Sequence, residues 1–458
     1  MRDQVWSIDF HTLHIERWSF NRQCIRGDEG ALAGSDSRMG IAAFGKHPNR
    51  CHNLSSSRRI GPHCPLDAPA AIATRPRSRD SWRSCGFRAD HAGAGRHRVA
   101  GRLIAMVMSS GCEGRELTTF GIVMEPSPGY TARLATDIEA MGFDALLCPD
   151  TQCLSPEPYG QLSLAAARTT RLKLSTGVTN PFTRDASVTA GALATLQVES
   201  GGRAFCAIGR GDSSAAHIGR RNATTAELRE YVEQVRGYLA GGEVQRGEAR
   251  SRLRWLAPGG LPMVPLDIAC TGPATIRMAV EVADHVTFSV GAAPERLRWA
   301  MDTALAHLAT VGRDRASLRI GAFVNLVCDA DERRAIGLGR MIAGMVAHFA
   351  GMKDSPVDHL PPRLKAIAER MKSGYDMGRH AQNDGAHLAM IDDAFVDWFS
   401  ICGPPSKCTE RLGELLAMGL DHVYLLGGSP VSAPHGARQE AMVRQSRLFA
   451  EAVLPGLR

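Results

Sequence analysis

Small and polar residues that could contact a ligand follow several short apolar stretches of the sequence. These residues are Asp150, Thr176 to Asn180, Gly209 to Asp212, Thr271 with Gly272, and Ser289 with Gly291. If the apolar stretches are parallel strands, their carboxyl ends meet at one face of the fold. Parallel α/β folds carry their chemistry at that face. The sequence therefore predicts one ligand site that several strand–loop–helix units build together.

A second group of reactive side chains lies in residues 373–399 and comprises Tyr375, His380 and His387. Histidine is the side chain best suited to move a proton near neutral pH. We therefore expect His380 and His387 to act in catalysis and Tyr375 to contact substrate. The alternative is that all three are exposed loop residues. The two histidines are seven residues apart without a carboxylate partner, so the spacing predicts no metal site.

Strand–loop–helix units recur from residue 117 onward. Residues 171–213 form the clearest one, and their length implies two parallel strands joined by a right-handed crossover helix. Strands are predicted near residues 119, 145, 173, 205, 267, 287, 322 and 424. Eight units in about 340 residues favour an α/β fold of the (β/α)8 TIM-barrel type. We expect a helical insertion at about residues 352–399, between strands 7 and 8.

A doubly wound open sheet is the alternative fold for the same alternation of strands and helices. The first predicted strand is not followed by the G-x-G-x-x-G pattern of dinucleotide-binding sheets. This absence and the count of eight strands favour the barrel.

The first 115 residues differ in composition from the rest of the chain. They contain 18 Lys and Arg against 10 Asp and Glu, whereas residues 116–458 contain 36 and 37. The excess positive charge therefore gives no reason to expect nucleic acid or an acidic membrane as a partner of residues 116–458. The cysteines of this segment lack C-x2-C spacing, and its acidic residues argue against a transit peptide. We interpret residues 1–115 as an unstructured extension or as upstream sequence read in frame, with an Arg-rich RNA-binding tail as the alternative.

In this interpretation the functional chain starts near Met106 or Met108. The sequence shows no early apolar region of a secretion signal, and no apolar run approaches the ~20 residues of a membrane span. Cys148, Cys206 and Cys270 lie in predicted buried strands, as small apolar residues would in a reducing compartment. We therefore expect a cytoplasmic protein without a membrane partner.

Several motifs, in order along the chain, carry a resemblance to a known family. They are TGVTNP, SGGR, IGRGDS, ACTGP, VEVADHV, CGPP and LAMGLDHV. Together they resemble the luciferase-like monooxygenase superfamily, and most of all its deazaflavin-dependent branch, which includes methylenetetrahydromethanopterin reductase. The resemblance covers about residues 118–455 and none of residues 1–115. Residues 373–399 also resemble an insertion found in a subset of these proteins, which suggests no particular substrate.

The resemblance implies a role for each strand end. The third strand of the family ends in a bulge with a non-prolyl cis peptide that supports the cofactor ring, and the matching bond is Gly177–Val178. Asn180 would face the pyrimidine end of the ring, and Asp150 would be a catalytic residue near ring and substrate. The IGRGDS loop would approach the cofactor tail, and the TGP motif would begin a helix whose N-terminus suits a phosphate. The implied cofactor-binding residues are Thr176, Gly177, Val178, Asn180, Gly209, Arg210, Gly211, Thr271, Gly272 and Pro273.

Each of these residues has a structural alternative. Gly177 could form a bulge without a ligand, and Asp150 could cap a helix or form a structural ion pair. Asp212 could cap the helix that follows it. The functional interpretation depends on all of these residues lying at strand ends of the same face.

The resemblance leaves three functions open. With a reduced 8-hydroxy-5-deazaflavin, the enzyme would transfer hydride to or from a small organic substrate. With FMN, it would be a two-component monooxygenase whose partner is a flavin reductase. The third alternative is a catalytically inactive flavin-binding barrel. The superfamily often forms homodimers through barrel helices, and the resemblance extends this expectation to the chain.

Overall fold

The computed structural model describes residues 4–8, 15–19, 118–350, 360–382, 385–428 and 435–458. The chain divides into one unit of Met1–Ala94 and a second of Gly95–Arg458. In the first unit, β1 (Gln4–Ile8) and β2 (Ile15–Ser19) pair as an antiparallel hairpin. The segment expected to lack structure therefore contains one hairpin, and the rest of residues 1–115 lies outside the described residues.

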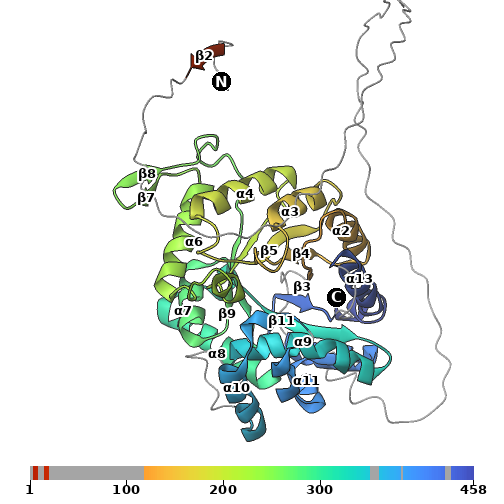
Figure 1. Cartoon of the computed structure of the whole chain (residues 1–458). Coiled ribbons are helices and arrows are strands. Elements are labelled where there is room, and N and C mark those ends of the chain that lie inside the picture. Colours follow the sequence, from red (N-terminus) through yellow and green to blue (C-terminus); the bar gives the residue numbers. More distant parts are fainter. Residues whose placement is uncertain (1–3, 9–14, 20–117, 351–359, 383–384, 429–434) are drawn as a thin grey trace, which may run out of the picture. The chain divides into compact units, whose positions relative to one another are not determined.

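The second unit contains a closed barrel of eight parallel strands (Figure 1). These strands are β3 (Thr119–Val123), β4 (Ala145–Cys148), β5 (Lys173–Thr179), β6 (Cys206–Ile208), β9 (Leu266–Cys270), β10 (His285–Phe288), β11 (Arg319–Cys328) and β13 (His422–Leu426). Their order is β10-β9-β6-β5-β4-β3-β13-β11, and the pairing of β10 with β11 closes the ring. The predicted barrel and the eight predicted strand positions are confirmed.

Helices follow the strands and surround the barrel. They are α2 (Thr131–Ala140), α3 (Pro158–Ala166), α4 (Ala186–Glu199), α5 (Ser213–Ala216), α6 (Thr225–Leu239), α7 (Pro273–Val282), α8 (Pro294–Val311), α12 (Pro405–Leu416) and α13 (His435–Ala452). Four of them, α3, α7, α8 and α12, begin with proline, whose missing N–H is not needed in the first turn. At α6, Thr224 and Glu227 form a capping box that satisfies two backbone N–H groups. Local sequence thus fixes where these helices begin.

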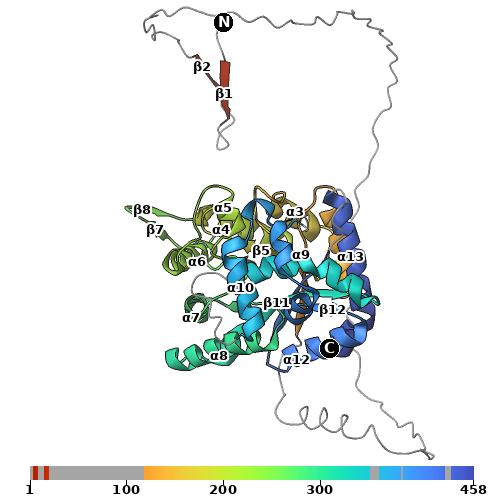
Figure 2. The ribbon, with the colours of Figure 1, turned by 60° about the horizontal axis from the view of Figure 1, so that its bottom comes forward.

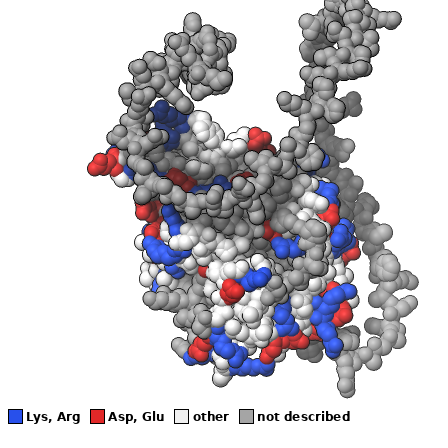
Figure 3. Space-filling model, in the orientation of Figure 1, with Lys and Arg blue, Asp and Glu red and all other residues white. Residues whose placement is uncertain are grey.

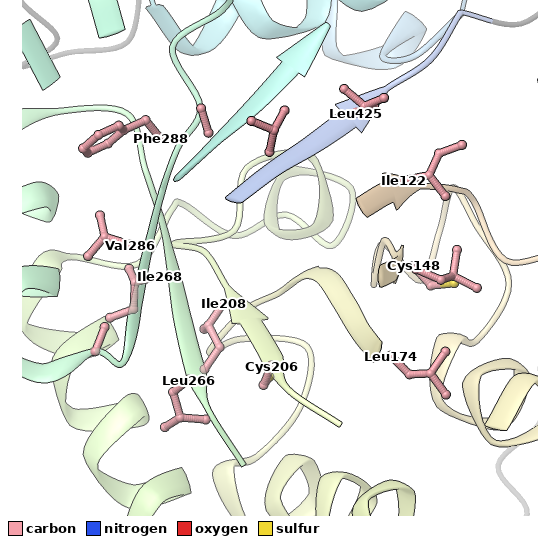
Figure 4. Close-up of a cluster of buried hydrophobic side chains, with 14 of the residues drawn as sticks. Ile122, Cys148, Leu174, Cys206, Ile208, Leu266, Ile268, Val286, Phe288 and Leu425 are labelled. Atoms are coloured by element: carbon pink, nitrogen blue, oxygen red, sulfur yellow. The ribbon is translucent and has the colours of Figure 1, made fainter. Parts of the chain in front are cut away.

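Alternation along the strands divides the apolar residues between two cores. Ile122, Leu146 and Cys206 belong to the core between strands and helices, and Figure 4 shows neighbouring members of this core. The next residue in each strand faces the barrel interior, where Val123, Leu147 and others pack together. The period of two is the expected consequence of strand geometry, since successive side chains point to opposite faces.

The barrel interior also contains a buried polar cluster formed by Asp267, Thr287 and His422. Thr287 Oγ1 lies 2.7 Å from both Asp267 carboxylate oxygens and 2.7 Å from His422 Nε2. Burial raises the pKa of Asp267 to about 7 and lowers the pKa of His422 well below its ordinary value.

A helical insertion lies between β11 and the last barrel strand. It contains α9 (Glu332–Ala350), α10 (Pro362–Gly374), the short 3-10 turns η2 (Met377–Arg379) and η3 (Ala386–Met390), and α11 (Asp393–Phe399). It is followed by β12 (Ile401–Gly403), which extends the sheet at the end of β11. The helices α9 and α10 lie side by side (Figure 2). The helical region therefore begins near residue 332, earlier than the predicted boundary at about residue 352.

Two further features complete the described part of the chain. A hairpin of β7 (Val244–Arg246) and β8 (Ala249–Ser251) lies between α6 and β9, where no strand was predicted. On the face drawn in Figure 3, basic and acidic side chains are interspersed. No helix in the described ranges combines the length and hydropathy needed to cross a bilayer.

Candidate active site

A cavity of about 520 Å³ opens at the carboxyl ends of the barrel strands. Each of the eight strands contributes at least one lining residue, either from the strand itself or from the loop that follows. Residues of α9, α13 and the segment 380–382 line the rest of the cavity. Its volume lies within the range typical of small-molecule sites, and its position is where barrels of this type place their active sites.

The structure brings most of the predicted site residues to this cavity. Those that line it are Gly177, Val178, Asn180, Gly209, Arg210, Gly211, Thr271 and His380. The others, Thr176, Gly272, Pro273, Asp150, Tyr375 and His387, are not lining residues. Among these, Thr176 is fully buried, and its hydroxyl donates to the Ala207 carbonyl at 2.8 Å. It therefore ties β5 to β6, and its one hydroxyl hydrogen is used within the barrel.

The end of β5 has the expected backbone geometry. The Gly177–Val178 peptide bond is cis, as the resemblance implied, and the pairing of β5 with β6 shifts register between Gly177 and Thr179. A Cβ atom on residue 177 would lie 2.7 Å from Leu147 Cβ, so only glycine fits at this approach. We call Gly177 and Val178 the ring seat, because their backbone forms the part of the cavity wall expected to support a flat ring.

Asn180 lies beside the ring seat, but its polar atoms hold the protein together. Its Nδ2 donates to Thr183 Oγ1 at 2.9 Å and to Ser214 Oγ at 3.0 Å. Its Oδ1 accepts from the backbone N–H groups of Phe182 and Thr183. The side chain therefore joins the loop after β5 to α5 and fixes the shape of this wall.

Asp150 does not line the cavity. It is buried, and its Oδ2 is 2.9 Å from Arg184 Nε. Thr179 Oγ1 donates to the same carboxylate at 2.8 Å. The Arg184 guanidinium in turn lies 4.7 Å from the centre of the Tyr159 ring. The geometry is that of the structural ion pair considered as the alternative, because Asp150 is buried and already has its partners.

The sector of the cavity after β6, β9 and β10 is polar. The hydroxyl-bearing residues that line this sector are Ser213, Ser214, Thr271, Thr275 and Ser289. The helix α7 begins here after Gly272, which caps it without a side-chain hydrogen bond. Arg210 contributes its side chain to the same wall and donates from Nε to the Ala223 carbonyl at 2.5 Å. Hydroxyl groups and a helix N-terminus are donors that suit the phosphate of a cofactor tail.

Among the candidates in the insertion, His380 lines the cavity. It is 6% exposed, and its Nδ1 lies 2.8 Å from the Tyr375 hydroxyl. Burial lowers the pKa of His380 to about 4, so the ring is neutral near pH 7. Tyr375 and His387 lie behind it, their ring centres 4.4 Å apart, and both are partly or fully buried. The insertion therefore presents His380 to a ligand, and the alternative of three exposed loop residues is wrong.

The sequence analysis did not single out His348, which joins the insertion to Asp212 in the loop after β6. His348 stacks on Tyr375 with ring centres 4.1 Å apart, and its Nε2 lies 3.3 Å from Asp212 Oδ2. Asp212 makes no side-chain capping bond to α5, which differs from the alternative proposed for it. No local pattern marks His348, because its partners lie far away in the sequence.

Glu125, Arg438 and Gln439 form a further part of the wall that was not predicted. Glu125 follows β3, and its Oε2 accepts from Arg438 Nη2 and from Gln439 Nε2, the latter at 3.0 Å. All three line the cavity. Glu125 stands two residues after the end of β3, so the rule that selected the other strand ends could have found it.

Comparisons with known proteins agree with this geometry. A family model described as "Luciferase-like monooxygenase" matches residues 106–422. The 5,10-methylenetetrahydromethanopterin reductase of Methanolobus tindarius is 30% identical over 331 residues, which cover 68% of this chain and 94% of the reductase. The solved structure of the coenzyme F420 dependent tetrahydromethanopterin reductase from Methanopyrus kandleri aligns with a TM-score of 0.59 and 24% identity, over 75% of this chain and 100% of that one. An F420-dependent secondary alcohol dehydrogenase aligns with a TM-score of 0.57 and 18% identity, with the same coverage.

Proposed function

The chain belongs to the luciferase-like monooxygenase family and is an oxidoreductase, and on this premise we propose that it uses a reduced deazaflavin to transfer hydride to or from a small organic substrate. The observation that carries the proposal is the ring seat, in which Gly177 and Val178 line a cavity at the strand ends. The similarity to a reductase over most of the chain favours the deazaflavin over FMN, since coenzyme F420 is a deazaflavin.

The residues present fit a cofactor with a flat ring and a phosphorylated tail. The ring seat offers a backbone surface without side-chain obstruction from residue 177. The hydroxyl groups of Ser213, Thr271 and Ser289 and the N-terminus of α7 would hold the phosphate. A reduced deazaflavin supplies a hydride when bound, whereas binding and orientation are the work of the protein.

His380 is the proposed catalytic residue of the chain. With the Tyr375 O–H donating to Nδ1, the neutral imidazole carries its hydrogen on Nε2, from which it can donate a hydrogen bond to a substrate oxygen. Tyr375 and His387 are positioning residues in this proposal, because neither lines the cavity. Asp150 has no proton-transfer role in it, since its carboxylate is occupied by Arg184 and Thr179.

The test is spectroscopic titration of the full chain with oxidised and reduced deazaflavin and, separately, with FMN. We expect micromolar binding of the deazaflavin and no oxygen uptake. The substitution Gly177→Ala should weaken binding roughly tenfold or more, because its Cβ would force Leu147 and the ring seat apart. The matched control is Gly191→Ala in α4, where an added Cβ has nothing within 4 Å.

The other results of the titration would favour one of the two alternative functions. Binding of FMN alone, with oxygen uptake, would assign the chain to the two-component monooxygenases and imply a flavin reductase as partner. Binding of neither cofactor would contradict the oxidoreductase proposal and favour an inactive barrel.

A further inference from the structure

What His380 offers to the cavity depends on its neighbour inside the insertion. Its Nδ1 lies 2.8 Å from the Tyr375 hydroxyl, whereas its Nε2 has no hydrogen-bond partner in the described part of the chain. This second nitrogen is not among the fully buried polar atoms, so it is accessible where His380 lines the cavity. A neutral imidazole carries one hydrogen. If Tyr375 donates to Nδ1, that hydrogen is on Nε2, and if Tyr375 turns away, the hydrogen can move to Nδ1.

A carboxylate close to this pair can compete for the Tyr375 hydrogen. Asp212 lies in the loop after β6, between Gly211 and Ser213, which also line the cavity. Burial raises the pKa of Tyr375, and the Asp212 charge raises it further. The same charge opposes the burial that lowers the pKa of His380. A carboxylate only accepts hydrogen bonds, so Asp212 would draw the Tyr375 O–H away from His380 if it lacked a partner of its own.

His348 on α9 is the partner of this carboxylate. Its Nε2 lies 3.3 Å from Asp212 Oδ2, and the two side chains are 15% and 18% exposed. Asp212 Oδ2 is fully buried and has no hydrogen-bond partner in the described ranges, so the contact is electrostatic and not an aligned hydrogen bond. A buried carboxylate is unfavourable without an opposite charge nearby, and the imidazole supplies that charge when it is protonated.

Two further observations connect Asp212 to the insertion and not to its own helix. Asp212 precedes α5 at the position where an aspartate ordinarily caps a helix, yet its side chain makes no capping hydrogen bond. The His348 ring is in turn stacked on Tyr375, with ring centres 4.1 Å apart and planes inclined by 18°. One imidazole therefore contacts both the competing carboxylate and the tyrosine.

We propose that His348 is a positioning residue, which occupies the Asp212 carboxylate and thereby keeps the hydrogen of His380 on Nε2. The Tyr375 hydroxyl, free of competition, donates to Nδ1 of that ring. The inference deepens the proposed function and rests on it in one respect, since the fixed N–H serves a substrate only if the chain is the proposed oxidoreductase. The tautomer itself needs no cofactor. Because Asp212 belongs to the loop assigned to the cofactor tail, His348 joins that loop to the proton donor.

The test measures the His380 tautomer in the full chain without cofactor, near neutral pH. Nitrogen NMR of protein labelled at its histidines separates the two tautomers, and the signals lost in His380→Gln assign this ring. In wild type we expect the hydrogen on Nε2. His348→Phe keeps a ring on Tyr375 but leaves Asp212 without its partner, so the ratio of the Nε2–H to the Nδ1–H tautomer should fall roughly tenfold, the weight of one hydrogen bond. His348→Gln loses the ring but keeps an N–H group for Asp212, and should keep the wild-type ratio.

A role in packing alone predicts the reverse order, because Phe would preserve the stack and Gln would not. An unchanged ratio in His348→Phe, a lost preference in His348→Gln, or a wild type with its hydrogen on Nδ1 would each overturn the inference. If His348→Phe does not fold, the wild-type and His348→Gln spectra decide. The matched control is His307→Phe on α8, at a histidine that is 16% exposed and 2.8 Å from Glu281, and it should leave the His380 tautomer unchanged.

Deazaflavin titration of the same samples separates this inference from the proposed function. A chain that binds the cofactor with the His380 hydrogen on Nδ1 contradicts only the role of His348. A chain that binds no cofactor contradicts the proposed function, whatever the tautomer.

Discussion

At the scale of single residues, the barrel interior holds a carboxyl group and a histidine that share one hydroxyl. A hydroxyl donates only one hydrogen, so Thr287 can donate to Asp267 or to His422 but not to both. If Asp267 is protonated, it donates to Thr287, and Thr287 donates to His422 Nε2. The raised pKa of Asp267 and the lowered pKa of His422, both caused by burial, favour this neutral arrangement.

This arrangement predicts how stability changes with pH. A carboxyl whose native pKa is about 7 holds a proton between about pH 4 and 7 that the unfolded chain has already lost. Its contribution to the free energy of unfolding therefore falls as the pH rises through that window. Between about pH 5 and 8, wild type should lose ~3 kcal/mol relative to Asp267→Asn, as measured by urea unfolding.

The Thr287→Val variant provides the control for this prediction. The Thr287 hydrogen bond lowers the pKa of Asp267, so its removal should move the loss of stability to higher pH. Identical pH dependence in wild type and Asp267→Asn would show that this carboxyl does not hold the extra proton.

Residue roles were predictable where they depend on strand ends and not where they depend on distant partners. The cis bond and the lining residues of the loops after β5 and β6 follow from local motifs. The direction of the Asp150 side chain depends on Arg184, which is 34 residues away. Gln439 meets Glu125 across 314 residues of sequence, so no local pattern can reveal this pair.

At the scale of elements, α9 is the helix that covers one side of the cavity. Its apolar residues Met341, Ile342, Met345, Val346 and Phe349 line the cavity wall. The sequence analysis placed the insertion too late because this stretch contains Gly337, Gly339 and Gly344, and glycine weakens a helix by roughly 1 kcal/mol each. Packing of α9 against α11 and β12 stabilises this helix, although its own sequence has a low helix propensity.

Two glycines of α9 test that packing. A Cβ added at Gly339 would lie 2.5 Å from Cys402 Sγ of β12, whereas one added at Gly337 would have nothing within 4 Å. Gly339→Ala should therefore lower the free energy of unfolding by about 1–3 kcal/mol through overpacking. Gly337→Ala should raise it by up to about 1 kcal/mol, because the unfolded chain loses freedom. Chemical denaturation of both variants decides the point, and equal effects would show that α9 does not pack on β12 in this way.

At the scale of the whole molecule, the barrel was predictable because each of its strands is an apolar run followed by turn residues or a helix. The strands β7, β8 and β12 each have only three residues, too few to show a period of two. They were missed because none belongs to the crossover unit of residues 171–213, which marked the equally short β6. Closure of the barrel was inferred from the count of eight, and the pairing of β10 with β11 confirms it.

The last prediction concerns the extension of residues 1–115. All eight barrel strands lie within residues 119–426, and the family match begins at residue 106. Because β1 and β2 belong to a separate unit, a chain that starts at Met106 should keep the barrel and its cofactor affinity. Its melting temperature should stay within about 2 °C of the full chain, since ~1 kcal/mol corresponds to a few degrees for a domain of this size. It should also lose retention on a cation exchanger, because the first 115 residues carry a net charge of +8 and the remainder −1.

A melting temperature lower by more than about 5 °C would show that the extension supports the barrel. Intact mass of the native protein tests the late start separately, because a species containing residues 1–105 would refute it.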